Sequence, residues 1–288
     1  MLNKFRLAHP FLFAVLIYLV FTVAMNGSGL LAYRFVDLVT GGSVGGEVEP
    51  LVEIFDEVVP ALVFCFILSR IGRFGLLKKR GRGFLTGLAV GGYCLAYIAF
   101  LAFGQLLSCL TDDMPINFTA VSVAYVVSML MVGVTEELEA RALIGETFLE
   151  HFGTERGGAI KAAVASGVIF GAMHLTNAIT DGIGDTAPQV CLCVTSGILY
   201  GAIYFRSGNI WSIALIHGLN DVAAGISVWL FAGGICVEQA AATASEFSLA
   251  SLAFPIVLGA LEVAVALYLL RPEKIGEVGQ SWPEIERA

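Results

Sequence analysis

Long runs of apolar residues, separated by short polar segments, dominate this chain. A helix needs about 20 residues to cross the roughly 30 Å of a bilayer's hydrocarbon core, and eight of the runs approach that length. Each predicts a membrane-spanning helix, and together they occupy residues 11–25, 51–68, 84–109, 119–134, 162–175, 190–205, 210–231 and 249–270. The pattern therefore predicts an all-α, polytopic membrane protein with about eight transmembrane helices.

The composition agrees with this prediction, because 57% of the residues are hydrophobic and only 14% are charged, unlike an average soluble domain. No linker divides the chain, so we expect one transmembrane domain over residues 1–275, with a motif-bearing core at 119–231. Residues 276–288 are expected to form a short acidic cytoplasmic tail. Glycines four residues apart predict close helix packing, and these pairs are Gly87 and Gly91, Gly167 and Gly171, and Gly197 and Gly201.

The distribution of Lys and Arg predicts the orientation, because these residues accumulate in cytoplasmic loops. With the N-terminus inside, eight spans leave only Arg34 outside and Arg141 in the membrane. We therefore expect both termini in the cytoplasm and location in the plasma membrane. The net charge of -8 comes mostly from acidic outer loops and the tail. No basic stripe indicates a nucleic-acid partner, so the expected partners are membrane lipid and a substrate.

Ionisable groups inside a membrane are energetically unfavourable and therefore mark candidate functional sites. Glu136, Glu137 and Arg141 follow directly on the apolar run that ends at Val134. On a helix Glu137 and Arg141 share a face and can pair, whereas Glu136, rotated by about 100°, is free to act as a general base. Three further carboxylates are expected to form a solvated stripe at the cytoplasmic end of this helix, namely Glu139, Glu146 and Glu150.

Two other apolar segments carry His174 and His217. Phe170 precedes His174 by four residues, so an aromatic ring shares the face of this imidazole on a helix. Asp221 follows His217 by four residues and can fix its tautomer or hold it as a proton-bearing donor. One shared polar cavity is more favourable than separate burial of each group. Within it a Glu and a His can orient a water, while the other His and an Asp or Asn stabilise an oxyanion.

The residue types of this group would also suit a metal-binding site. Two histidines and a carboxylate are typical zinc ligands with one open position, and here they would be Glu136, His174 and His217. Zinc is therefore kept as an alternative cofactor, while no cofactor is the main expectation.

In chain order, the motifs Glu136-Glu137-x-x-x-Arg141, Phe170-x-x-x-His174 and His217-x-x-x-Asp221 resemble those of the CPBP intramembrane proteases. This family includes the CAAX prenyl endopeptidases and bacterial proteins linked to bacteriocin processing or self-immunity. The resemblance implies a helical membrane fold and an endopeptidase that acts on a membrane-associated or lipidated peptide. It implies that Glu136 and His174 activate the water and that His217 and residue 221 form the oxyanion site. The residues that shape the site would be Glu137, Arg141, Phe170 and Asn220.

One position departs from the family, whose members often carry Asn where this chain has Asp221. An ionised Asp cannot donate a hydrogen bond to an oxyanion. Asp221 must therefore be protonated, or must orient His217, or must leave the role to Asn220. Two other classes of function stay open, namely a non-catalytic membrane scaffold or immunity factor of the same fold and a proton-coupled transporter.

The depth of the motifs raises a geometric question. Lys161 is expected at the inner surface, so His174 lies about 20 Å along its helix, whereas Glu136 and His217 are expected nearer the inside. Tilt, a fifth helix that starts outside the bilayer, or a kink near Gly133 is needed for the three to meet in a cavity open to the cytoplasm. Four other intramembrane carboxylates have no assigned role. Glu53, Asp56 and Glu57 are expected at the hydrated outer end of the second span, and Glu262 lies in the last span.

Overall fold

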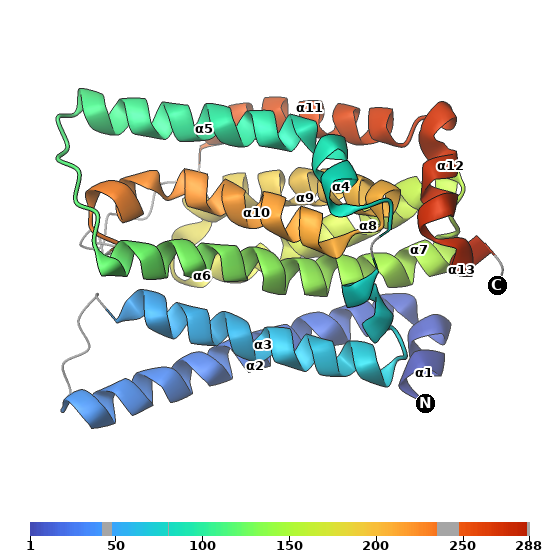
Figure 1. Ribbon diagram of the computed structural model, residues 1–288, viewed down its shortest axis with the longest axis horizontal. Coiled ribbons are helices and arrows are strands. Elements are labelled where there is room, and N and C mark those ends of the chain that lie inside the picture. Colours follow the sequence, from blue (N-terminus) through green and yellow to red (C-terminus); the bar gives the residue numbers. More distant parts are fainter. Residues whose placement is uncertain (42–47, 80, 235–247, 287–288) are drawn as a thin grey trace.

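The structure of the protein, a computed structural model, describes residues 1–41, 48–79, 81–234 and 248–286. Within these residues every regular element is helical, so the predicted all-α fold is confirmed. The longer helices run along the long axis of a bundle, and both chain termini lie at the same end of it (Figure 1). We refer to that end as the terminal end.

The α-helices are α1 (Leu2–Ala8), α2 (Pro10–Thr40), α3 (Glu49–Arg70), α4 (Phe84–Val90), α5 (Gly92–Thr111), α6 (Ala120–Glu137), α7 (Glu146–Phe152), α8 (Arg156–Met173), α9 (Gly182–Ser207), α10 (Ile210–Ala224), α11 (Ala253–Leu269), α12 (Pro272–Ser281) and α13 (Pro283–Glu286). Short 3₁₀ turns form η1 (Phe74–Lys78), η3 (His174–Ile179) and η5 (Leu249–Leu252), whereas η2 (Leu138–Gly145) and η4 (Ser227–Phe231) are π-helical.

The helices suit a membrane. Six segments of the described chain are long and apolar enough to cross one, and they are Pro10–Thr40, Gly92–Thr111, Ala120–Phe152, Arg156–Ile179, Gly182–Ser207 and Leu249–Leu269. Helix α10 is apolar but shorter, and the 22-residue α3 is interrupted by acidic residues. Large apolar side chains such as Phe66 and Phe100 are exposed, as expected of a surface that faces lipid. The chain is a polytopic helical membrane protein, and the number of spans and the side of the termini stay predictions.

The C-terminal segment packs on the terminal end of the bundle. Residues 272–286, which include most of the expected tail, form α12 and α13. Trp282 is fully buried, and its indole N–H donates to the Phe205 carbonyl at 2.9 Å. The Lys79 ammonium lies 3.6 Å from the centre of the same ring. Residues 276–286 are therefore part of the folded bundle. The sequence predicts only an acidic tail there, because its composition carries no signal of these contacts.

The expected solvated stripe on the fourth span is wrong for two of its three residues. Helix α6, the turn η2 and α7 form one helical rod, and Glu139 and Glu146 are fully buried within it. Arg6 from α1 donates to Glu146 at 2.9 Å and to Glu150 at 2.5 Å. The arginine compensates for the buried charge of Glu146, whereas neither oxygen of Glu139 has a hydrogen-bond partner among the described residues. Only Glu150 is partly exposed.

The same rod explains the depth of the motifs. Glu136 lies at the middle of the rod, which spans Ala120–Phe152, rather than near its inner end. His174 immediately follows the last residue of α8. The expectation that Glu136 lies nearer the inside is therefore wrong, and the two residues meet at similar depth.

Glycine brings the site-bearing backbones into contact. A Cβ atom added at Gly133 of α6 would lie 2.4 Å from the Gly218 nitrogen and 2.6 Å from the Ala214 carbonyl oxygen, both of α10. Helices α8 and α9 cross in the same way, because a Cβ at Gly197 would lie 2.9 Å from the Gly167 Cα. The predicted close packing at the paired glycines of these two helices is confirmed.

The substitution Gly133→Val is expected to push α6 away from α10 and to lower the free energy of unfolding by about 1–3 kcal/mol, the usual cost of overpacking. The measurement is thermal unfolding in detergent. Gly104→Val is the matched control, since a Cβ at Gly104 of α5 has no neighbour within 4 Å. Equal melting temperatures for the two variants would contradict the close crossing.

An ion-pair cluster fastens α12 to the terminal end. Arg206 Nε donates to Glu277 at 3.0 Å, Lys274 Nζ donates to it at 2.9 Å, and Arg82 is a third partner. Burial raises the pKa of Glu277, but the hydrogen bonds from Arg206 and Lys274 and the charges of Arg206 and Arg82 outweigh burial and lower the pKa to about 2.

This lowered pKa predicts a pH-dependent contribution to stability. The ordinary value is 4.5, so the unfolded chain binds this proton first as the pH falls. The stabilisation is present above about pH 4.5 and is lost as the pH falls toward 2. Glu277→Gln should therefore lower the melting temperature at neutral pH and flatten its decline between pH 5 and pH 3. Glu273→Gln, whose native side chain is 73% exposed, is the control. An unchanged pH profile in Glu277→Gln would refute this role.

Candidate active site

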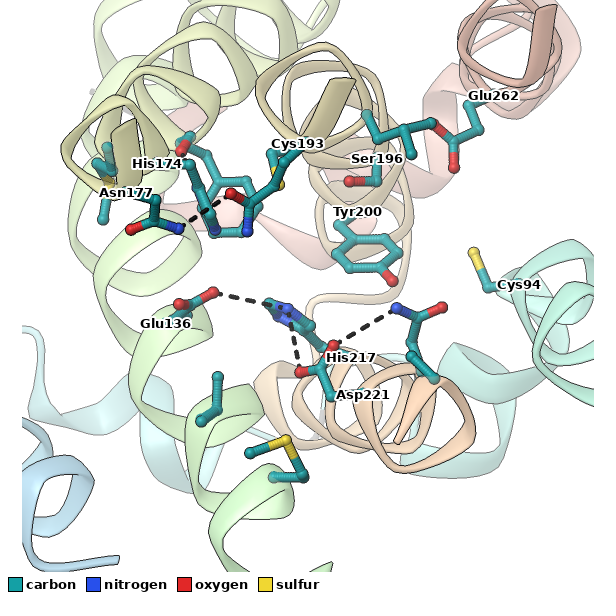
Figure 2. Close-up of a pocket in the computed structure, with 18 of the residues that line it drawn as sticks. Cys94, Glu136, His174, Asn177, Cys193, Ser196, Tyr200, His217, Asp221 and Glu262 are labelled. Carbon is teal, nitrogen blue, oxygen red and sulfur yellow. Dashed lines mark hydrogen bonds and ion pairs between the residues drawn. The ribbon is translucent and has the colours of Figure 1, made fainter. Parts of the chain in front are cut away.

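A cavity of about 680 Å³ lies within the bundle, between α2, α6, α9, α10 and their neighbours. Six of the eight residues singled out in the sequence line it, and they are Glu136, Phe170, His174, His217, Asn220 and Asp221. The other two, Glu137 and Arg141, are fully buried and contact the site from behind. Glu136, His174 and His217 point into the same space (Figure 2).

Glu137 and Arg141 form the pair that their spacing predicts. Arg141 Nε donates to Glu137 Oε2 at 2.8 Å. The guanidinium carbon also lies 5.1 Å from the centre of the Phe170 ring and 5.9 Å from that of Tyr200, within cation–π range. The carboxylate and the two rings together compensate for burying this cation, whose Nη1 has no hydrogen-bond partner among the described residues.

Glu137 has a second partner that sequence spacing could not reveal. Its Oε1 lies 3.0 Å from His217 Nδ1, so one carboxylate joins Arg141 on one side to an imidazole on another helix. Asp221, the partner expected from spacing, lies 3.7 Å from His217 Nε2, and Glu136 lies 3.6 Å from the same nitrogen. These two separations are longer than a hydrogen bond. Glu137 therefore orients the His217 ring, whereas Glu136 and Asp221 flank its other nitrogen.

His174 is held in one tautomer by the backbone. Its Nδ1 lies 2.9 Å from the Phe170 carbonyl oxygen, which can only accept a hydrogen bond, so Nδ1 carries the proton. In the neutral ring Nε2 is then an acceptor. The Phe170 ring packs edge-on against both imidazoles, with centroids 5.0 Å from His174 and 5.8 Å from His217. This phenylalanine fixes the two rings relative to each other.

Asp221 has no strong hydrogen-bond partner. Its Oδ2 is buried without a hydrogen-bond partner among the described residues, and its Oδ1 lies 3.5 Å from Asn220 Nδ2. The protein therefore holds this carboxyl group only weakly.

Sequence reasoning missed several residues that line the cavity. Tyr200 is buried, and its ring centre lies 5.4 Å from that of His217. Asn177 donates to Gln189 at 3.0 Å on another wall. Neither pair has a short-range spacing that would have marked it, because each joins different segments of the chain.

The arrangement does not form a metal site by itself. Among the described residues, no group of three or more His, Cys, Asp or Glu side chains is placed to hold a metal ion. Glu136, His174 and His217 share the cavity but do not converge in that way. Zinc dependence stays a prediction, and no catalytic step below is assigned to a metal.

Residues 118–223 match the family model described as type II CAAX prenyl endopeptidase Rce1-like. The matched segment contains all three motifs, so the resemblance to the CPBP and CAAX protease family is confirmed. No curated protein and no solved structure matches the chain.

Proposed function

We propose that this chain is an intramembrane endopeptidase of CPBP type, which hydrolyses a peptide bond in a membrane-associated or lipidated peptide. The observation that carries the proposal is the convergence of Glu136, His174, His217 and Asp221 on one cavity inside a membrane bundle. These residues come from three helical segments, α6, η3 and α10, and each would be unfavourable if buried alone in lipid. The family match at residues 118–223 supports the same reaction class.

In the proposed mechanism Glu136 and His174 activate a water molecule. Glu136 accepts one proton of the water, and His174 Nε2 accepts a hydrogen bond from the other, which is consistent with its Nδ1 proton on the Phe170 carbonyl. The hydroxide oxygen attacks the carbonyl carbon of the substrate. Glu136 then returns its proton to the leaving amine, so the water is divided between the two products.

His217 and Asp221 are proposed to stabilise the tetrahedral oxyanion. With Nδ1 bound to Glu137, the His217 imidazolium can donate from Nε2 to an oxyanion. Asp221 can donate beside it only in its protonated form. Otherwise it acts by orienting His217, from which it is 3.7 Å away.

Cleavage of a peptide library in detergent tests this proposal. Glu136→Gln and His174→Ala are each expected to lower the rate by about 10²-fold or more, the usual contribution of an acid–base group. Asp221→Asn is expected to retain activity if residue 221 donates to the oxyanion, because an amide N–H can donate there. Glu273→Gln, at an exposed position, is the control for handling and folding.

The outcomes separate the alternatives. Equal product from wild type, Glu136→Gln and His174→Ala would reject proteolysis at this site and leave a non-catalytic scaffold or a transporter. Loss of wild-type activity with a chelator, and its return with Zn²⁺, would convert the proposal to a zinc-dependent protease.

We also propose location in the plasma membrane, with the termini and the access route to the cavity on the cytoplasmic side. The basic residues Arg6, Arg73, Arg82 and Arg206 lie at the terminal end, as their ion pairs with α7 and α12 indicate, and this supports cytoplasmic termini.

A cysteine placed at Glu273, an exposed residue of α12 at the terminal end, tests the side of the termini. In a background without native cysteines, a membrane-impermeant maleimide is expected to label it in inverted vesicles and not in intact cells. Labelling in intact cells would place the termini on the other side of the membrane.

A further inference from the structure

Glu262 of α11 is a buried carboxylate that the catalytic proposal does not use. It lies within a candidate membrane span and is only 6% exposed. It nevertheless lines the cavity, and its side chain points toward that space from the wall formed by α11 (Figure 2). A carboxylate kept at such a position needs a partner.

Only one oxygen of the Glu262 carboxylate has a hydrogen-bond partner among the described residues. Thr195 Oγ1 donates to Glu262 Oε2 at 2.6 Å. No hydrogen bond to Oε1 is present among the described residues, although this atom is not sealed from the cavity. One face of the carboxylate is thus held in position while the other is available to a ligand.

Aromatic side chains share this cavity with Glu262. Tyr93 and Tyr97 lie four residues apart on α5 and both line the cavity. A carboxylate beside aromatic rings is the usual environment for an ammonium or guanidinium group, because the ring faces attract the cation as well.

The charged side chains that line the cavity also favour a cationic ligand. Its carboxylates come from four different helices and are Glu53, Glu136, Asp221 and Glu262. Among the described residues that line it there is no Lys or Arg. The nearby Arg141 is already paired with Glu137. The His217 imidazolium already faces Glu136 and Asp221, so the carboxylates remain in excess and the cavity matches a cationic group.

We propose that Glu262, Tyr93 and Tyr97 form a subsite for a Lys or Arg side chain of the peptide substrate. This inference rests on the proposed endopeptidase function. Tyr200 lies between Glu262 and the His217–Asp221 group (Figure 2). The cationic side chain would thus bind beside the reacting bond and not at the activated water.

Peptide binding tests the subsite without requiring turnover. Fluorescent peptides with a single Lys are compared with otherwise identical peptides in which norleucine replaces that Lys, and the Lys position is scanned along the peptide. They are bound to detergent-solubilised protein in the inactive Glu136→Gln background. At one Lys position we expect the Lys peptide to bind about tenfold more tightly, which corresponds to 1.4 kcal/mol.

Two variants assign this preference to particular residues. Glu262→Gln should abolish the Lys preference while leaving the binding of the norleucine peptide unchanged. Glu53→Gln is the matched control, because Glu53 lines the same cavity and also accepts a hydrogen bond from a hydroxyl, that of Ser128 at 2.8 Å. It should retain the preference. Tyr97→Leu should reduce the preference in part, since one ring is lost.

Equal binding of the Lys and norleucine peptides at every position would overturn the subsite. Loss of the preference in Glu53→Gln as well as in Glu262→Gln would show that the overall negative potential is responsible, and this would overturn the assignment to Glu262. Cleavage by the protein with native Glu136 is measured separately. A Lys preference in binding without any cleavage would refute the endopeptidase function and leave the cation subsite standing.

Discussion

The Arg141–Glu137–His217 chain of contacts is the interaction on which the site depends. Each of these groups, buried alone at this depth, would carry an uncompensated polarity or charge. Together they share one carboxylate, with Arg141 2.8 Å from one oxygen and His217 3.0 Å from the other. Because Glu137 uses both oxygens in this way, the adjacent Glu136 is the carboxylate that remains free to face the cavity.

Backbone geometry places these groups within reach of each other. The glycines Gly133 and Gly218 let α6 and α10 touch, which brings Glu136 and Glu137 beside His217. Directly after Glu137 the rod widens into the π-helical turn η2, which carries Arg141. Such turns are rare and are found frequently at functional sites. Here the turn carries the arginine to the rings of Phe170 and Tyr200.

The sequence could predict what depends on neighbours within one helix. The apolar runs identified the helical segments, and the four-residue spacing of Glu137 and Arg141 predicted their pairing. It could not predict contacts between distant segments. The spacing predicts only Arg141 as a partner of Glu137. In the structure Glu137 also binds His217, 80 residues away. For the same reason Glu146 was expected in water, since nothing in the local pattern shows that Arg6 reaches it.

The balance of charge links the catalytic residues to the opposite wall. Four carboxylates line the cavity, His217 faces two of them, and Arg141 is committed to Glu137. A poorly solvated cavity tolerates such an excess only if protons or a bound cation compensate for it. A substrate that brings its own positive charge to Glu262 would replace one such proton. Peptide binding and catalysis would then share one balance of charge, because the proposed subsite and the catalytic residues line the same cavity.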